Sequence, residues 1–197
     1  TLAGEVKTSI FNARSHNYQT AREAALSNNH IPEEVYDNLV KTVHKYLPLL
    51  HRYTELRKSL LELDDMKMYD LYTPLVKDVK FDMPYEEAKS WMLKALEPMG
   101  EEYMNVVREG LNNRWVDVFE NKGKRSGGYS SGAHLTNPFI LLNWSNTVSD
   151  LYTLVHEFGH SVHSSFSRNH QPANASDYTI FVSAVASTCN EALLSDY

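Results

Sequence analysis

Residues Asn146–Arg168, NTVSDLYTLVHEFGHSVHSSFSR, decide the fold because two periodic stripes run along them. Apolar residues recur at steps of three and four, which is the spacing of one face of an α-helix. The apolar stripe consists of Leu151, Val155, Phe158, Val162 and Phe166. A second stripe with the same spacing, rotated from the first, carries His156, His160 and His163. The pattern predicts one amphipathic helix with histidines along one face.

The pentapeptide H-E-x-x-H occupies residues 156–160 of this helix. Two imidazoles four residues apart can bind one Zn²⁺, and the glutamate between them can accept a proton from a water molecule on that metal. We therefore expect His156 and His160 as zinc ligands and Glu157 as the general base. His163 is interpreted as a packing or supporting residue. The alternative is that the paired histidines are satisfied core residues.

The composition is that of a globular protein without a strongly basic surface. The chain has 197 residues, 42% of them hydrophobic, and a formal net charge of −6. No block of Lys and Arg occurs, so nucleic acid is not an expected partner. No run approaches the ~18 apolar residues of a membrane span. The single cysteine, Cys189, excludes an internal disulfide and favours a reducing compartment. Its small and apolar neighbours predict a buried, inert thiol.

The region 1–113 is predicted to be helical. Its longest predicted helix starts near Pro32 and has an apolar stripe that continues to Leu63. Pro48 should kink or split this helix. The segment 64–82 is expected to be irregular, with a short strand possible. The predicted helices of this region cover 4–28, 31–63, 85–97 and 101–112.

The region 114–197 is predicted to hold a small sheet and the metal-site helices. Trp115–Phe119 and Phe139–Trp144 are the expected strands, and Lys122–Gly132 is expected to be a loop. Ser176 is the predicted N-cap of a last helix over 177–197. The predicted fold class is mainly α, a zincin-like helical core with a small β-sheet beside the H-E-x-x-H helix. The chain starts at Thr1 and stops within a predicted helix, so we expect a piece of a longer polypeptide.

A sheet edge next to the metal could bind a peptide through main-chain hydrogen bonds. The strand with Phe139, Ile140 and Leu141 is the candidate for that edge. The loop containing Gly127, Gly128 and Tyr129 could approach the substrate backbone, because glycine has no side chain. The alternative for both segments is an ordinary scaffold role.

Motifs spread over nearly all 197 residues resemble bacterial oligoendopeptidase F, a relative of thimet oligopeptidase. The resemblance implies a cytoplasmic zinc endopeptidase that acts on short peptides, with a largely helical fold and a deep channel that excludes folded proteins. It also implies that this chain covers only the central part of the family enzyme. The matching motifs are Ala13-Arg14, Tyr18, Ala21, Ile31-Pro32, Val35–Leu39, His51–Tyr53, Tyr69–Tyr72, Lys124–Gly127, Tyr129–Gly132, Asn137-Pro138, Leu142–Trp144 and His156–His163.

The resemblance implies a third zinc ligand, a glutamate about 28 residues after the first histidine, where this chain has Ala184. Glu191 matches a second family glutamate and is interpreted as a residue that supports a ligand. Glu191 and Asp177 each lie seven residues from position 184, roughly 10 Å along a helix, so neither is expected to replace the ligand. We therefore expect reduced zinc affinity and low or absent peptidase activity.

Two origins of Ala184 are considered, an inactivating substitution and a natural degenerate copy, and the intact H-E-x-x-H favours the first. The expected partners are short peptide substrates and the rest of the parent polypeptide. The alternatives to an impaired enzyme are a non-catalytic peptide-binding module and an inactive structural fragment.

Overall fold

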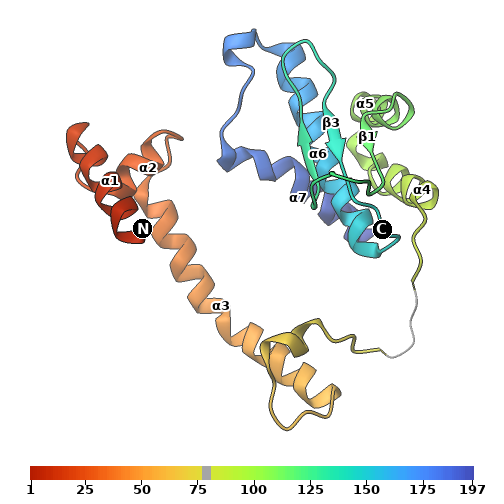
Figure 1. Cartoon of the computed structure of the whole chain (residues 1–197), viewed down its shortest axis with the longest axis horizontal. Coiled ribbons are helices and arrows are strands. Elements are labelled where there is room, and N and C mark those ends of the chain that lie inside the picture. The colour runs from red at the N-terminus through yellow and green to blue at the C-terminus, as the bar shows by residue number, and fades with distance from the viewer. Residues whose placement is uncertain (77–80) are drawn as a thin grey trace. The chain divides into compact units, whose positions relative to one another are not determined.

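The computed structural model describes residues 1–76 and 81–197, which form two compact units. The first unit spans Thr1–Val79 and the second spans Lys80–Tyr197. Each unit is described by itself, and Figure 1 gives the order of their elements. None of the helices in the described residues combines the length and the apolar character that crossing a bilayer requires.

The first unit consists of α1 (Leu2–Ser15), α2 (Ala21–Ser27), α3 (Glu33–Leu60) and a 3-10 helix, η1 (Met68–Tyr72). The prediction of one helix over 4–28 is wrong, because Asn17 adopts a left-handed backbone conformation with φ of 64°. Thr20 then caps α2 by accepting a hydrogen bond from the amide of Glu23. A short strand was considered possible in segment 64–82, but within the described residues of this segment the 3-10 helix η1 forms instead. Val79, which belonged to that prediction, lies outside the described residues.

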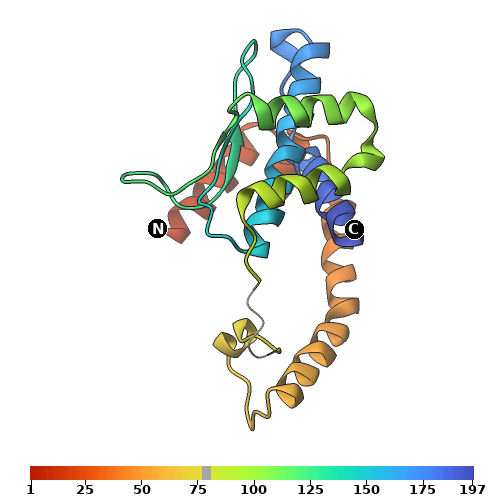
Figure 2. The ribbon, with the colours of Figure 1, turned by 90° about the vertical axis from the view of Figure 1, so that its right-hand side faces the viewer.

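The long helix α3 runs through Pro48 without being split (Figures 1 and 2). Its predicted apolar stripe is helical but remains exposed. Near the end of α3, buried Arg57 hydrogen-bonds to the carbonyl oxygen of Thr73 at 2.6 Å. The exposed members of the stripe are Val35, Leu39, Val43, Tyr46, Leu50, Tyr53, Leu56 and Leu60.

The second unit contains the hydrophobic core and every predicted residue of the metal site. Its helices are α4 (Tyr85–Ala95), α5 (Glu101–Asn112), α6 (Val148–His170) and α7 (Ile180–Asp196), with short 3-10 helices η2 (Glu97–Met99) and η3 (Ala173–Ala175). The structure places α4 and α5 here, whereas the sequence grouped them with the N-terminal helices. The reason is packing, because buried residues of both helices join the core around α6. These core residues are Ala88, Met92, Ala95, Tyr103, Met104 and Val107, against Leu151, Leu154, Val155, Phe158 and Val162.

A three-stranded sheet lies beside α6, in the order β1-β3-β2 (Figure 1). β1 (Val116–Asp117) pairs with β3 (Phe139–Leu141) in parallel, and β2 (Tyr129–Ser131) pairs with β3 antiparallel. The mainly α fold with a small sheet is therefore as predicted. The prediction of a loop over Lys122–Gly132 is wrong near the C-terminal end of this segment, where Tyr129–Ser131 form β2. The short run Tyr-Ser-Ser gives little strand signal without the partner strand.

The helix α6 begins and ends close to the predicted limits and is capped at its start. Thr147 Oγ1 accepts a hydrogen bond from the amide of Asp150 at 3.1 Å, and Asp150 Oδ2 accepts one from the amide of Thr147 at 2.8 Å. This reciprocal pair is a capping box. The start of α7 differs from the prediction, since its N-cap is Thr179 and Ser176 instead ends η3.

The helices α6 and α7 pack closely against each other at Gly159. A Cβ atom at this position would lie 2.5 Å from the Cα atom of Ser187. One turn farther on, the side-chain nitrogen of buried Asn190 donates to the carbonyl oxygen of Val155 at 3.1 Å, and Tyr103 donates to Asn190 at 2.9 Å. These contacts fix how α7 faces the histidine stripe.

Candidate metal centre

His156 and His160 lie one turn apart on α6 and bring their Nε2 atoms within hydrogen-bonding distance of each other. Their Nε2 atoms are 3.1 Å apart, and the ring centroids are separated by 4.7 Å at an interplanar angle of 79°. The rings therefore share one environment instead of being buried in separate packing sites. The two imidazoles are therefore side by side on one face of α6, as the sequence predicted.

The spacing of the two nitrogens suits a shared metal ion. Nitrogen ligands lie about 2.0–2.1 Å from a tetrahedral zinc ion, and hence roughly 3.3 Å from each other. The observed separation is 3.1 Å. Within residues 1–76 and 81–197, no group of three His, Cys, Asp or Glu side chains has a metal-binding arrangement. The described residues thus offer two suitable donors and no third.

Glu191 lies on the outer side of His156. Its carboxylate accepts a hydrogen bond from Nδ1 of His156, while Nε2 of the same ring faces His160. A carboxylate on the far nitrogen fixes the tautomer and the orientation of an imidazole ligand. The geometry gives Glu191 this supporting position, from which it does not point at the space between the two Nε2 atoms.

Glu157 is buried, with 6% of its surface exposed, and points toward the strand β2. Burial raises the pKa of its carboxyl group, while the neighbouring charge of His156 and a hydrogen bond from the backbone of Ser130 oppose this shift. The net direction is a raised pKa, which moves Glu157 toward the pH range in which a carboxylate works as a general base.

His160 and His163 both have lowered pKa values, chiefly because burial disfavours the charged imidazolium. His163 stacks on the ring of Tyr178, with the centroids 3.9 Å apart. The hydroxyl of Tyr178 lies 2.7 Å from Ser164 Oγ. His163 therefore packs against the segment between α6 and α7, in agreement with its interpretation as a supporting residue.

Position 184 lies on the face of α7 that is turned toward the histidine pair. It precedes buried Ser187 by three residues and Glu191, the hydrogen-bond partner of His156, by seven, so the three positions share one face of α7. Ala184 itself is exposed. Asp177 lies before the start of α7, so it is not on the helix from which its distance to position 184 was derived. Cys189 is also exposed, contrary to the predicted buried thiol.

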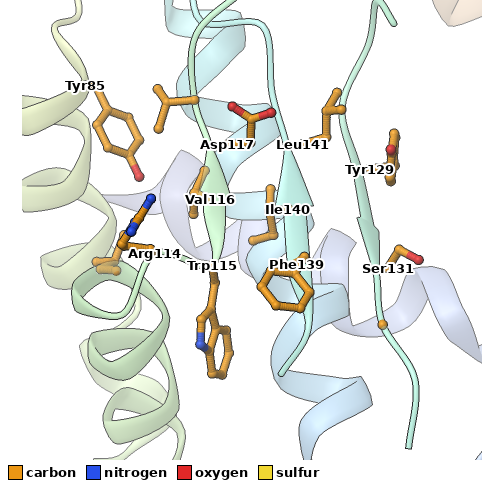
Figure 3. Close-up of a pocket in the computed structure, with 13 residues that line it drawn as sticks. Tyr85, Arg114, Trp115, Val116, Asp117, Tyr129, Ser131, Phe139, Ile140 and Leu141 are labelled. Atoms are coloured by element: carbon orange, nitrogen blue, oxygen red, sulfur yellow. The ribbon is translucent and has the colours of Figure 1, made fainter. Parts of the chain in front are cut away.

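Four of the six predicted substrate residues line an open hollow on the outer side of the sheet (Figure 3), namely Tyr129, Phe139, Ile140 and Leu141. The hollow has a volume of about 690 Å³ and extends past β1 to the side chains of Tyr85 and Arg114. Tyr129 and Phe139 expose about half of their surface there, whereas Ile140 is buried in the core. Gly127 and Gly128 line a separate hollow of about 150 Å³ at the start of β2.

The expectation that Phe139–Leu141 forms a sheet edge is wrong, because β3 is the central strand. The amide of Ile140 donates to Trp115 on the β1 side, so the polar groups of Phe139 and Leu141 face β2. Ser130, opposite Ile140, consequently directs its N–H and C=O away from β3. The outer edge nearest to Glu157 belongs to β2.

Ser130 is a site residue that the sequence did not single out. Its backbone lies near enough to Glu157 to act on the pKa of that carboxyl group, and its hydroxyl lies 2.8 Å from Ser161 Oγ on α6. The sequence placed Ser130 between two glycines and within the motif Tyr129–Gly132, but neither signal gives its role until the strand lies along α6.

A largely helical core with H-E-x-x-H on a helix beside a small sheet defines the class of helical zincin-like peptidase folds. The chain belongs to peptidase family M3, whose family model matches residues 1–197. It is 66% identical over its whole length to oligopeptidase PepF of Bacillus subtilis, of which it covers 29%. The resemblance to oligoendopeptidase F is thereby confirmed.

Solved structures agree with this family. A protein of Chlamydophila abortus is 40% identical with a TM-score of 0.82, over 99% of this chain and 33% of that one. Oligoendopeptidase F of Enterococcus faecium is 43% identical with a TM-score of 0.60, over the whole of this chain and 27% of that one. The chain thus spans about three tenths of the length of the curated relatives it matches.

Proposed function

We propose that this chain is the metal-site part of a zinc-dependent endopeptidase that cleaves short peptides, and that Ala184 impairs it. The observation that carries the proposal is the convergence of the Nε2 atoms of His156 and His160 beside the buried carboxylate of Glu157. Membership of peptidase family M3 supports the reaction class. The single cysteine supports a reducing, cytoplasmic setting.

His156 and His160 would hold the zinc ion, and Glu191 would keep His156 oriented for it. The ion would supply Lewis-acid polarisation of the scissile carbonyl and a water molecule of lowered pKa. Glu157 would take the proton of that water and deliver it to the leaving amine. Its burial excludes bulk water from the carboxylate, and its raised pKa favours this exchange of a proton.

The peptide would add to the outer edge of β2 as a further strand. Ser130 C=O and the neighbouring backbone on the same edge are directed away from β3 and toward the side of Glu157. Binding through main-chain groups accepts many side chains, which suits an enzyme for short peptides of varied sequence. Tyr129 and Phe139 would contact side chains on the outer face of the sheet.

The role of position 184 is tested with the full-length protein in two forms, with Ala184 and with Ala184→Glu. A glutamate on the face of α7 that faces the histidines adds a third ligand. We expect zinc affinity to rise at least about 100-fold, because loss of a mere supporting group already costs 10–100-fold. Bound zinc is measured by metal analysis after dialysis, and cleavage of a short peptide by chromatography.

The matched control is Ala184→Glu combined with Glu157→Gln, which should bind zinc tightly but cleave roughly 10²–10⁴-fold more slowly. Stoichiometric, tightly held zinc in the Ala184 form would contradict the assignment of position 184. If Ala184→Glu gains zinc but no cleavage, and the Ala184 form binds peptides, the chain is instead a non-catalytic peptide-binding module.

A further inference from the structure

The segment between β1 and β2 is attached to the sheet by two side chains that the reaction does not require. Lys124 Nζ, on a side chain that is only 3% exposed, donates to the carbonyl oxygens of Asp117 at 3.0 Å and Phe119 at 2.7 Å. Asn143, directly after β3 and Leu142, donates from Nδ2 to the carbonyl oxygens of Arg125 and Gly127, both at 2.9 Å.

The two hydrogens of a side-chain amide nitrogen are both used at Asn143. Gly127 has φ of 93°, a conformation that L-residues with side chains rarely adopt, and this turn directs its carbonyl group toward Asn143. The following residue, Gly128, passes close to α6, where a Cβ atom would lie 2.7 Å from Thr153 Cγ2. The backbone from 125 to 128 therefore follows one narrow path.

Packing holds this path at Gly128, where Thr153 and Leu142 approach the backbone closely. The residues before Gly128 are held by polar contacts, because a hollow of about 150 Å³ lies beside the two glycines, Leu142 and Asn143. Lys124 hydrogen-bonds across the part of the segment that precedes residue 125. Asn143 is the side chain that hydrogen-bonds to residues 125 and 127, immediately before β2.

The direction of β2 matters because Ser130 follows Gly127 by only three residues. The hydroxyl of Ser130 lies 2.8 Å from Ser161 Oγ on α6, the helix that carries Glu157. A shift of the segment would turn these groups and the outer edge of β2 away from α6. We infer that Asn143 is a positioning residue for peptide binding, because it holds β2 with its outer edge beside Glu157; this inference rests on the proposed function.

The test uses the full-length protein with Ala184, which should bind a peptide without cleaving it. The dissociation constant of a fluorescently labelled short peptide is measured by anisotropy for the parent, for Asn143→Asp and for Asn143→Ala. Asn143→Asp keeps the size of the side chain but places a carboxylate against two carbonyl oxygens. The matched control is Asn169→Asp on α6, where the amide is exposed and makes only a 3.4 Å contact with Ser165.

We expect peptide binding to weaken roughly tenfold in both Asn143 variants and to be unchanged in Asn169→Asp. Hydrogen exchange measured by mass spectrometry should become faster in residues 124–132 and stay the same in α6. This local change separates a positioning role from a general loss of stability.

Peptide binding by both Asn143 variants with the affinity of the parent would overturn the inference and leave the proposed function standing. Faster exchange throughout α6 would overturn it as well, since Asn143 would then stabilise the whole unit. Absence of peptide binding in the parent would overturn the proposed function and this inference together.

Discussion

Single residues of the site were predictable where their chemistry is local. His156, Glu157 and His160 follow from the sequence because their spacing on one helix fixes their geometry. Ser130 and Asn143 do not, because they act through partners 16 or more residues away along the chain. Nothing in the pattern of residues 125–143 indicates which carbonyl an asparagine will meet.

Asp150 acts locally as well, because it stabilises the first turn of α6. Burial alone would raise the pKa of its carboxyl group, but hydrogen bonds from the backbone and side chains of Thr147 and Ser145 outweigh burial, so the pKa is lowered. A lowered pKa in the folded state means that the ionised carboxylate stabilises the fold. This stabilisation is present above the unfolded pKa and is lost as the pH falls through the folded pKa.

We predict that Asp150→Asn lowers the free energy of unfolding at pH 7 by about 1 kcal/mol, since a neutral amide oxygen replaces the charged oxygen that accepts hydrogen bonds from Ser145 and Thr147. The difference from the parent should narrow as the pH falls below about 4, because the parent then loses its own carboxylate. Urea denaturation of both proteins at several pH values measures this. A difference that stays constant down to pH 3 would show that the charge of Asp150 contributes nothing.

At the scale of elements, the packing of α6 on α7 sets where position 184 lies. We predict that Gly159→Ala destabilises the protein by about 1–3 kcal/mol, because the new methyl group would meet the backbone of Ser187 at 2.5 Å. The same variant should lower the zinc affinity gained by Ala184→Glu, since α7 must move away from the histidines. Thermal denaturation and metal analysis give the two measurements.

The matched control for this prediction is Gly4→Ala in α1. There the new Cβ atom would meet only the side-chain oxygen of Thr1, at 3.3 Å. Alanine is the better helix former, so this change should be neutral or slightly stabilising. Equal effects of the two substitutions would refute the close approach at Gly159.

Long helices were predictable as elements, whereas their ends and the sheet were not. The periodic apolar residues of α3 and α6 predict both helices. Thr147 and Asp150, three residues apart, mark the start of α6 in the sequence itself. The break at Asn17 depends on a left-handed backbone conformation that asparagine allows but does not require, and the cap at Thr179 depends on an extended conformation that most residues can adopt. The strand β2 depends on pairing with β3, which only the fold brings beside it.

At the scale of the molecule, the apolar stripe of α3 is exposed, and none of the described residues buries it. Leu39, Leu50 and Leu60 each expose more than half of their surface, on a helix of 28 residues. Their spacing is typical of a helix that packs against another helix. Exposed apolar surface of this extent is a site of association.

We predict that residues 1–197 alone form dimers or larger species in solution, and that Leu39→Glu with Leu50→Glu restores a monomer. Two charges on the stripe should oppose burial of the remaining apolar side chains against a second helix. The control, His44→Glu with Ser59→Glu, adds the same charge at exposed polar positions on another face of α3 and should leave association unchanged. Sedimentation velocity at several concentrations measures the species present. If residues 1–197 sediment as a monomer at all concentrations, the stripe is not an association surface, because burial of this helix face would then give no measurable gain.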